Sequence, residues 1–297
     1  MSQRIEYLLP ERIQSDSPIW INPVGGLGDI LMLSTAIKHA YDKYGKQFHL
    51  CRRSQYTEFF VGHPAVAEIG NPPESADIVS NDYWSRPDFS DVHNKALHIV
   101  FKIFGVEDII DDTLYLPEFQ RDLPTDLIIK NIPWGKKNVI ISFSSESPRK
   151  MMHPIKWHLI VDKLLAQQCF VIQIGTNGDI PIQGTYSLLG VTTPLQICEI
   201  IKHADLVICP DNFIMHVAKL VQKKAIALFG PTEPERYGYS NHICLKADKN
   251  NCNLIEKCLG PHVSENYSTH CPLNENHCMN SFNENKIVDI AMTILTK

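Results

Sequence analysis

The sequence predicts an α/β protein built on doubly wound parallel sheets. Short apolar runs bounded by glycine, proline or polar residues alternate with segments whose apolar side chains recur at helical spacing. This alternation is typical of βαβ units, in which neighbouring strands are parallel. Two strand–loop–helix units, at 19–40 and 205–234, carry glycine or acidic residues directly after the strand. Because open α/β sheets bind ligands at the carboxyl ends of their strands, we expect the two units to face each other and to bind a ligand in a cleft between two domains.

The expected elements follow in chain order. In the first half we predict strands at 18–24, 47–51 and 76–80 and helices at 28–40 and 94–105. In the second half we predict strands at 138–143, 169–174, 205–209 and 225–229 and helices at 155–167, 194–203 and 214–222. Acidic and proline residues recur through 107–137, which is typical of a segment that connects two domains. We predict a first domain at 1–130 and a second domain at 131–297. A cysteine-rich tail at about 245–282 and a final helix complete the second domain.

Composition narrows the class of protein. The chain has 297 residues, 44% of them hydrophobic and 21% charged, as in ordinary globular proteins. A formal charge of -5 gives no basis for nucleic-acid binding, which needs a concentrated basic surface. No apolar run is long enough for a transmembrane helix, and the first ten residues are too short and too acidic for a signal peptide. We therefore expect a cytoplasmic location.

The glycine-rich segment Gly25-Gly-Leu-Gly-Asp29 follows the first predicted strand and opens a helix. Gly26 and Gly28 would let a ligand approach the backbone, and Asp29 would meet the positive end of the helix dipole. Asp29 therefore has two interpretations, a functional carboxylate and a simple helix cap. The segment lacks the full Gly-x-Gly-x-x-Gly spacing, so it is weak evidence for a dinucleotide site.

The loops of the second half supply candidate ligand-binding groups. Arg149 and Lys150 follow the strand at 138–143 and would meet a diphosphate, although a solvated basic pair is the alternative. Asp211 would accept hydrogen bonds from sugar hydroxyls or cap the next helix, and His216 lies one turn further on. The remaining candidates are loop positions at strand ends, namely Gly175, Gly230, Thr232 and Glu233.

Eight of the nine cysteines fall into two groups. Four lie in or beside apolar segments and are expected to be small core residues: Cys51, Cys169, Cys198 and Cys209. Four others, Cys252, Cys258, Cys271 and Cys278, occupy 27 residues of a polar tail. Four thiolates make a closed structural metal site, and soft ligands select zinc or iron. Free reduced thiols, or one disulfide, are the alternative.

Taken together, these segments resemble glycosyltransferase family nine, the ADP-heptose:lipopolysaccharide heptosyltransferases and their relatives. The resemblance rests on four segments in order, which are 28–37, 204–211 with His216, 228–232 and 236–238. It implies the GT-B fold, two Rossmann-like domains that face a central cleft. It also implies an inverting transfer of heptose or a related sugar from an ADP-linked donor to an acceptor hydroxyl, with Asp29 as the general base.

The same resemblance assigns roles to the other candidates. Arg149 or Lys150 and the turn at 230–232 would stabilise the leaving diphosphate, and Asp211 would orient the transferred sugar. No metal or other cofactor is implied for the chemistry. The cysteine tail is similar to that of autotransporter heptosyltransferases, which carry a cysteine-ligated iron, and would brace the chain. The acceptor is left open among lipopolysaccharide or another glycan, a protein hydroxyl and a small molecule, and a homo-oligomer is compatible with the sequence.

The sequence departs from the family pattern, and rival functions follow from that. Asn212 and Phe213 stand where the family has Thr-Gly, and Met151 and Met152 stand where it has a tryptophan. A non-catalytic scaffold assembled through the cysteine tail is one rival. A nucleotide-dependent oxidoreductase or epimerase is another, but the chain has no Tyr-x-x-x-Lys pair and its glycine fingerprint is incomplete. The presence of both Asp29 and Asp211 favours the transferase.

Overall fold

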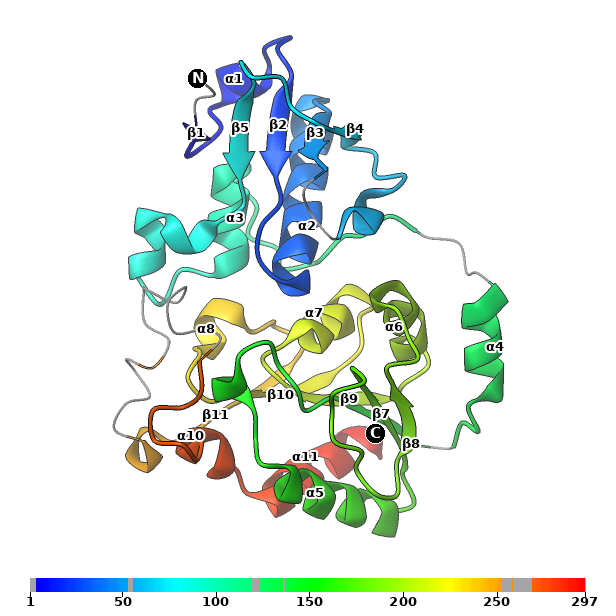
Figure 1. Ribbon diagram of the computed structural model, residues 1–297. Coiled ribbons are helices and arrows are strands. Elements are labelled where there is room, and N and C mark those ends of the chain that lie inside the picture. Colours follow the sequence, from blue (N-terminus) through cyan, green and yellow to red (C-terminus); the bar gives the residue numbers. More distant parts are fainter. Residues whose placement is uncertain are drawn as a thin grey trace. The chain divides into compact units, whose positions relative to one another are not determined.

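The computed structural model describes residues 4–52, 56–118, 123–135, 137–252, 258 and 269–296 (Figure 1). Its contacts divide the chain into two compact units. The first comprises Met1–Phe119 with Glu235–Tyr237, and the second comprises Gln120–Pro234 with Gly238–Lys297. Each unit is built around its own parallel sheet. The domain boundary expected between residues 130 and 131 stays a prediction.

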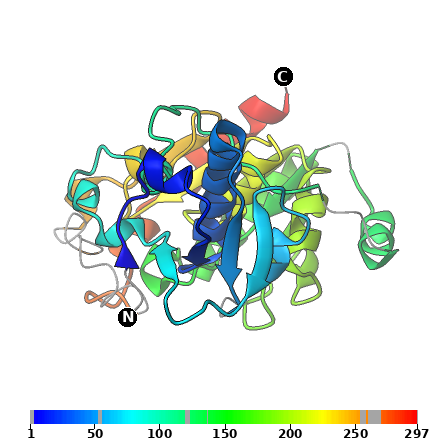
Figure 2. The same ribbon diagram turned by 90° about the horizontal axis from the view of Figure 1, so that it is seen from above.

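The first unit contains a sheet of five parallel strands in the order β1-β5-β2-β3-β4. Its strands are β1 (Arg4–Ile5), β2 (Ile19–Asn22), β3 (Phe48–Cys51), β4 (Val66–Gly70) and β5 (Asp77–Ser80). Its helices are α1 (Pro10–Ile13), α2 (Leu27–Tyr44), α3 (Ala96–Ile103) and the 3₁₀ turns η1 (Thr57–Phe60), η2 (Tyr83–Ser85) and η3 (Pro87–Ser90). Figure 2 shows the same ribbon from above, with α2 lying against the strands of this sheet.

The second unit contains a sheet of six parallel strands in the order β11-β10-β9-β6-β7-β8. Its strands are β6 (Asn138–Ile141), β7 (Phe170–Gly175), β8 (Tyr186–Leu189), β9 (Leu206–Pro210), β10 (Ala225–Phe229) and β11 (Ile243–Lys246). Its longer helices are α4 (Leu123–Asn131), α5 (Pro154–Ala166), α6 (Pro194–Ile201), α7 (Phe213–Leu220) and α11 (Glu284–Leu295). Its short helical turns are η4 (Pro148–Lys150), η5 (Lys249–Asn251) and α10 (His277–Asn280). The short helix α8 (Pro234–Tyr237) belongs to the first unit, except for Pro234.

The predicted strands and helices are all present, with boundaries that differ by a few residues. The largest difference is α2, which continues beyond residue 40 until Gly45 ends it in a left-handed conformation with φ of +70°. Four strands that the sequence did not predict, β1, β4, β8 and β11, are short, with two to five residues each. These strands lie at or near sheet edges and are largely exposed or half-buried, so they lack an apolar signal.

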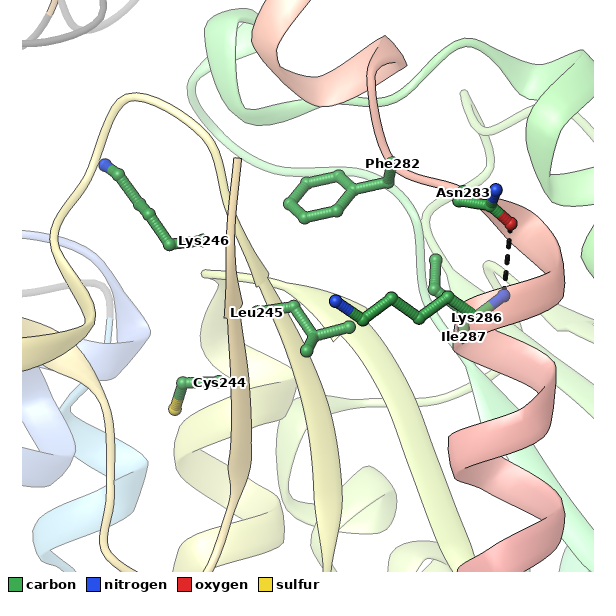
Figure 3. Close-up of a pocket in the computed structure, with 7 residues that line it drawn as sticks. All are labelled: Cys244, Leu245, Lys246, Phe282, Asn283, Lys286 and Ile287. Carbon is green, nitrogen blue, oxygen red and sulfur yellow. Dashed lines mark hydrogen bonds between the residues drawn. The ribbon is translucent and has the colours of Figure 1, made fainter. Parts of the chain in front are cut away.

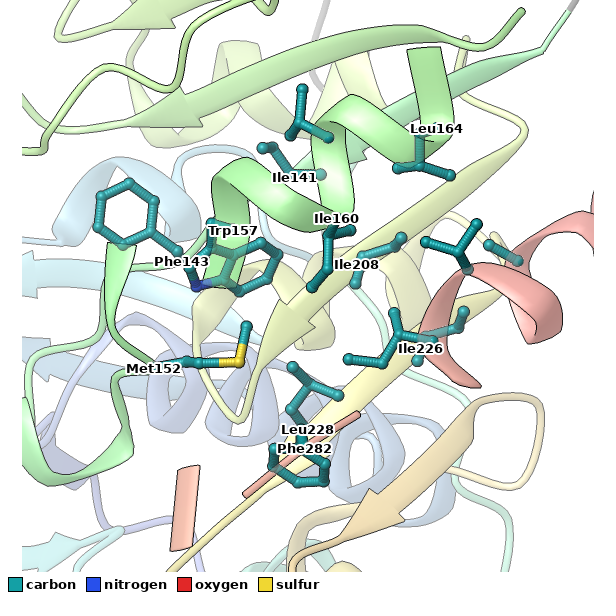
Figure 4. Packing of buried hydrophobic residues seen from close by; sticks show 14 of the residues in the cluster. Ile141, Phe143, Met152, Trp157, Ile160, Leu164, Ile208, Ile226, Leu228 and Phe282 are labelled. Atoms are coloured by element: carbon teal, nitrogen blue, oxygen red, sulfur yellow. The ribbon is translucent and has the colours of Figure 1, made fainter. Parts of the chain in front are cut away.

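The core of the second unit explains why its central strands were the easiest to predict. Every residue of β9 and β10 is buried, as expected for strands covered on both faces. Trp157 of α5 is fully buried beside Phe143 and Met152, and its ring centroid lies 6.2 Å from that of Phe143 (Figure 4). The final helix α11 packs against α5 and closes this side of the sheet (Figure 1). The four cysteines predicted as core residues are all buried.

Among the described helices, none is both long enough and apolar enough to cross a membrane.

Candidate functional site

Strand order locates one switch point in each sheet. In the first sheet the chain progresses from β2 to β3 and β4 on one side, whereas β5 adds to the other side of β2. In the second sheet β6 leads to β7 and β8 on one side, whereas β9, β10 and β11 extend the other. In open α/β sheets, ligands bind beside the loops at such a switch point, which here are the loops after β2 and β5 and those after β6 and β9. The predicted residues Asp29, Lys150 and Asp211 lie in or beside these four loops.

Asp29 is the third residue of α2, and its carboxylate is held from two directions. The Gly26 N–H donates to Oδ2 at 2.7 Å, and the Tyr83 hydroxyl donates to Oδ1 at 2.9 Å. The first bond is the helix cap that the sequence suggested as an alternative, so Asp29 does cap α2. A carboxylate has about four lone-pair positions, so capping leaves it able to accept further hydrogen bonds.

Gly25 explains why glycines precede this aspartate. Its φ is +91°, and a Cβ placed on it would lie 2.7 Å from Cγ of Asp29. Only glycine tolerates both the backbone conformation and the approach of the carboxylate. Gly26 supplies the capping N–H. The acceptor-side roles of Gly26 and Gly28 stay predictions.

In the second unit Lys150 and Asp211 meet across the switch point. Lys150 ends η4 and Asp211 directly follows β9, and Nζ lies 3.4 Å from Oδ2 of the carboxylate. Both side chains are buried, with exposed fractions of 7% and 6%. A buried lysine and aspartate of this kind neutralise each other, and a diphosphate or sugar that entered would interact with groups already in place.

The helix cap at α7 is Asn212 and not Asp211, which corrects the expectation that the acidic residue opens this helix. Asn212 Oδ1 accepts from the Ile214 N–H at 3.0 Å and from the Met215 N–H at 3.4 Å. Its side-chain NH₂ donates to the Ser144 carbonyl at 2.8 Å and to Ser142 Oγ at 3.3 Å. Asn212 therefore joins α7 to the loop after β6, and Asp211 is left to pair with Lys150.

Arg149 lies beside Lys150 but contacts a different part of the chain. Its guanidinium donates to the Cys258 carbonyl at 2.9 Å, to Cys258 Sγ at 3.2 Å and to the Thr269 carbonyl and hydroxyl. The side chain is thus committed to the cysteine-rich tail. Of the two basic residues predicted to meet a diphosphate, the structure places Lys150 beside Asp211 and Arg149 against the tail.

His216 is fully buried and neutral. Burial is the main cause that lowers its pKa to about 4, and nearby Lys150 lowers it further while Asp211 opposes the shift. Its Nδ1 lies 2.6 Å from the Tyr239 hydroxyl, and the two rings meet edge to face. These contacts fit a structural histidine that supports the Asp211 region. Its donor-binding role stays a prediction.

Gly175 ends β7 where a carboxylate packs closely against the backbone. A Cβ on Gly175 would lie 3.2 Å from Cγ of Asp179, whose Oδ2 accepts from the Thr176 N–H at 2.7 Å and the Ser144 hydroxyl at 2.8 Å. Asp179 therefore ties the loop after β7 to the loop after β6. A direct contact between Gly175 and a donor stays a prediction.

The turn after β10 is held by a lysine that sequence analysis missed. Nζ of Lys246, at the end of β11, donates at 2.8 Å to each of three oxygens, the Gly230 carbonyl, the Thr232 carbonyl and Glu233 Oε1. The Thr232 hydroxyl is buried without a hydrogen-bond partner among the described atoms. A buried unpaired hydroxyl is costly, so a ligand that paired with it would bind more tightly.

The four tail cysteines lie close enough to influence one another. Burial raises the pKa of Cys278 to about 11, and the charges of Cys252, Cys258 and Cys271 add to that rise. Gly230 packs on the same region, since a Cβ there would lie 3.1 Å from Cys278 Sγ. In the part of the chain that the structure describes, no three His, Cys, Asp or Glu side chains are arranged to hold a metal ion.

A cavity of about 150 Å³ lies between β11 and the start of α11 (Figure 3). Leu245 points into it toward Phe282 and Ile287, whereas Cys244 and Lys246 extend from the opposite face of the strand (Figure 3). Of the lysines, Lys246 is committed to the turn after β10 and Lys286 is exposed. This cavity lacks the convergent polar groups of a ligand site.

Two further residues near Asp29 were missed, although a signal was present. Asn81 and Tyr83 directly follow the predicted strand at 76–80, and polar residues after a parallel strand mark the edge where ligands bind. Asn81 is fully buried and clamps the glycine loop, because it accepts from the Val24 N–H at 2.9 Å and donates to the Val24 carbonyl at 3.0 Å. Lys246 gave no comparable signal because β11 itself was not predicted.

The sequence of the chain matches a known protein family, and this match indicates what kind of enzyme contains these two switch points. Residues 115–270, more than half of the chain, match the model of glycosyltransferase family 9, described as heptosyltransferase. The chain belongs to glycosyltransferase family 9. It is therefore a glycosyltransferase, which excludes the oxidoreductase and epimerase readings and favours an enzyme over a scaffold. No curated protein matches the chain in sequence.

Solved structures show the fold of this family 9 glycosyltransferase. The iron-containing dodecameric glycosyltransferase TibC from enterotoxigenic E. coli H10407 has a TM-score of 0.70 at 16% identity, over 95% of this chain and 77% of that one. E. coli ADP-heptose lps heptosyltransferase II has a TM-score of 0.66 at 12% identity, over 94% and 98%. A family 9 glycosyltransferase from Veillonella parvula has a TM-score of 0.70 at 12% identity, over 96% and 98%. The chain thus has the GT-B fold that the resemblance implied.

Proposed function

We propose that the protein is an inverting heptosyltransferase that moves a heptose from an ADP-linked donor to an acceptor hydroxyl, with Asp29 as the general base. One observation carries this proposal. Asp29 is a half-buried carboxylate at the switch point of the first sheet, with both oxygens fixed by hydrogen bonds. A base needs a fixed position within reach of the nucleophile more than it needs unusual basicity. The ADP-heptose donor is supported by the family and by the structural neighbours.

The proposed reaction is a single displacement. As the acceptor oxygen attacks the anomeric carbon, its proton passes to the Asp29 carboxylate. The bond between that carbon and the diphosphate oxygen breaks at the same time, so the configuration inverts and ADP leaves. Carboxylate catalysis of this type contributes roughly 10²–10⁴-fold to the rate.

The donor side of the proposal rests on the second switch point. Lys150 would stabilise the negative charge that develops on the leaving diphosphate, and Asp211 would accept hydrogen bonds from the sugar. The turn at Gly230, Thr232 and Glu233 would line the diphosphate, and its buried Thr232 hydroxyl is available as a partner. Arg149 would act less directly, since its guanidinium binds the tail. The scheme requires no metal for chemistry.

The decisive test is Asp29→Asn. Asparagine keeps an oxygen that can accept the Gly26 N–H, so the cap of α2 is retained while the base is removed. We expect turnover to fall by roughly 10²–10⁴-fold, with calorimetric affinity for ADP unchanged. Asp42→Asn is the matched control, because Asp42 lies on the same helix and is exposed. Turnover within a few-fold of wild type in Asp29→Asn would remove Asp29 from the mechanism.

The donor is tested by binding. We expect ADP and ADP-heptose to stabilise the protein in thermal-shift and calorimetric assays, with weaker or no response to UDP, GDP and CDP. Lys150→Ala should weaken the binding of ADP more than that of adenosine, because its charge meets the phosphates. Equal losses for both ligands would remove Lys150 from the phosphate site.

The cysteine tail is the basis of a second, structural proposal. Burial raises the pKa of Cys258 and of Cys278, and the neighbouring tail thiols add to both rises, so the thiols lie close enough together to form a donor set that a divalent cation would neutralise. The neighbour TibC is iron-containing. We propose that Cys252, Cys258, Cys271 and Cys278 hold one iron or zinc that braces the tail against Arg149 and Gly230. Such a metal would supply folding energy and take no part in the transfer.

Metal analysis tests the tail directly. Protein purified without affinity nickel should contain about one iron or zinc per chain. Cys271→Ser should lose that metal and unfold at a lower temperature, whereas Cys51→Ser, which alters a buried core thiol, should keep it. A folded wild-type protein without metal would exclude the site.

The acceptor, location and assembly stay predictions. A lipopolysaccharide or another glycan, a protein and a small molecule are all acceptors with a suitable hydroxyl, and product analysis with each class distinguishes them. A cytoplasmic location and a homo-oligomer are the remaining expectations. Light scattering would measure the oligomer, for which the dodecameric neighbour TibC is the precedent.

A further inference from the structure

Tyr83 is a buried tyrosine that no sequence motif singled out. It opens η2 directly after β5, on the other side of the switch point from Asp29. Its hydroxyl donates to Asp29 Oδ1 at 2.9 Å, while the opposite carboxylate oxygen accepts from the Gly26 N–H. The carboxylate is therefore held between a backbone amide at the start of its own helix and a side chain from the turn that follows the neighbouring strand.

The position of the Tyr83 hydroxyl is itself fixed by packing. The side chain is 6% exposed, and its ring meets Trp84 edge to face at 5.0 Å and Phe89 at 5.7 Å. The Tyr83 N–H donates to the Asn81 carbonyl at 2.7 Å, which tightens the turn after β5. Asn81 in turn clamps Val24 at the start of the glycine loop. The loops after β2 and β5 are thus locked to each other around the Asp29 carboxylate.

We propose that Tyr83 is a positioning residue that holds the Asp29 carboxylate in the orientation in which it accepts the proton of the acceptor hydroxyl. This inference rests on the proposed role of Asp29 as the base. A phenol is a far weaker acid than a carboxylic acid, so the Tyr83 proton stays on the phenol oxygen. Tyr83 therefore transfers no proton in the reaction. It fixes one carboxylate oxygen and leaves other lone-pair positions for the acceptor.

A hydrogen bond to an ionised carboxylate also favours the ionised form. The Tyr83 hydroxyl should thus favour the ionised form of Asp29, relative to the same carboxylate without this bond. Of the other titratable groups on this segment, Asp82 is paired with Arg86 at 2.9 Å, and both are buried. Loss of the Tyr83 hydroxyl should therefore affect the rate by its effect on Asp29. It should shift the acid limb of the pH–rate profile, where the base becomes protonated, to higher pH.

The test is Tyr83→Phe, with Tyr7→Phe as the matched control. Tyr7 donates to Asp88 Oδ2 at 2.7 Å, so the control also removes one tyrosine–carboxylate bond from the same unit, away from Asp29. We expect Tyr83→Phe to lower single-turnover rates about 10- to 100-fold, to leave the donor KM unchanged and to move the acid limb to higher pH. Tyr7→Phe should leave all three values unchanged.

The combination with Asp29→Asn separates this inference from the proposed function. If Tyr83 acts through Asp29, Tyr83→Phe should cause no further loss in the Asp29→Asn protein, since residues that act as a unit are not additive. An additional loss there, or an unchanged rate and acid limb in the single variant, would overturn the positioning role. Full activity of Asp29→Asn alone would instead refute the proposed base.

A second substitution covers the case in which Tyr83→Phe does not fold. Replacement of Tyr83 by 3,5-difluorotyrosine keeps the ring and hydroxyl but makes the phenol a stronger hydrogen-bond donor. The acid limb should then move to lower pH, opposite to the shift in Tyr83→Phe. An acid limb that stays in place would overturn the inference.

Discussion

Replacing Asn212 by alanine should lower both the stability of the second unit and its affinity for ADP. Asn212 stands where the family has threonine, and its side chain makes two kinds of contact. Its oxygen caps α7 through the N–H groups of Ile214 and Met215, and its NH₂ donates to the Ser144 carbonyl and Ser142 Oγ in the loop after β6. Asn212→Ala removes both sets at once.

The magnitude follows from these contacts. Loss of a helix cap costs about 1 kcal/mol, and each hydrogen bond lost to the β6 loop adds about 0.5–1.5 kcal/mol. Two such bonds are lost, so the free energy of unfolding should fall by about 2–4 kcal/mol. Thr193→Ala is the matched control, because Thr193 caps α6 through the Gln196 N–H. It should cost about 1 kcal/mol and leave ADP binding unchanged.

Urea denaturation and calorimetry with ADP measure the two effects. Without the bonds from Asn212, the loop after β6, which carries Lys150, is held less firmly in the free protein. Ordering this loop when the nucleotide binds costs free energy, so the affinity for ADP should fall by about threefold or more. Asn212→Thr keeps a capping oxygen but loses the amide donors, and should lie between wild type and Asn212→Ala in stability. The reasoning is wrong if Asn212→Ala loses no more stability than Thr193→Ala and binds ADP as wild type does.

Two further predictions concern backbone space and buried histidines. Gly25→Ala should abolish turnover because the new Cβ would occupy the place of the Asp29 carboxylate at a φ of +91°, whereas Gly45→Ala, with φ of +70° and no atom within 4 Å of its Cβ, should cost about 1 kcal/mol and keep turnover. For the histidines, burial lowers the pKa of His216 and of His63 from 6.5 to about 4 in the folded protein. The unfolded chain therefore binds these protons more strongly, so stability should be full above about pH 6.5 and fall toward pH 4, by up to about 1.4 kcal/mol per pH unit for each histidine. Urea denaturation at several pH values should show a shallower fall for His63→Gln or His216→Gln, and an unchanged slope in both would contradict the burial argument.

The sequence was most informative where local chemistry and burial agree. The central strands β9 and β10 are apolar at every position, or nearly so, because both faces are covered, and this pattern was visible without a structure. The short strands β4 and β11 are exposed or half-buried at nearly every position and carry mixed side chains, so their sequences give no such pattern. The contact of Lys246 with the turn after β10 was not predicted for the same reason, because Lys246 lies at the end of β11.

The sequence by itself determined the α/β class, the family resemblance and the placement of Asp29, Lys150 and Asp211 in loops that follow strands. These properties depend on periodicity and on residue order, which are local. Only the tertiary structure decided which side chains meet. It gave the cap of α7 to Asn212, directed Arg149 to the cysteine tail and brought Tyr83 to Asp29 across 54 positions of chain. Such contacts are set by strand order and packing, and residues distant in the chain carry no local signal of them.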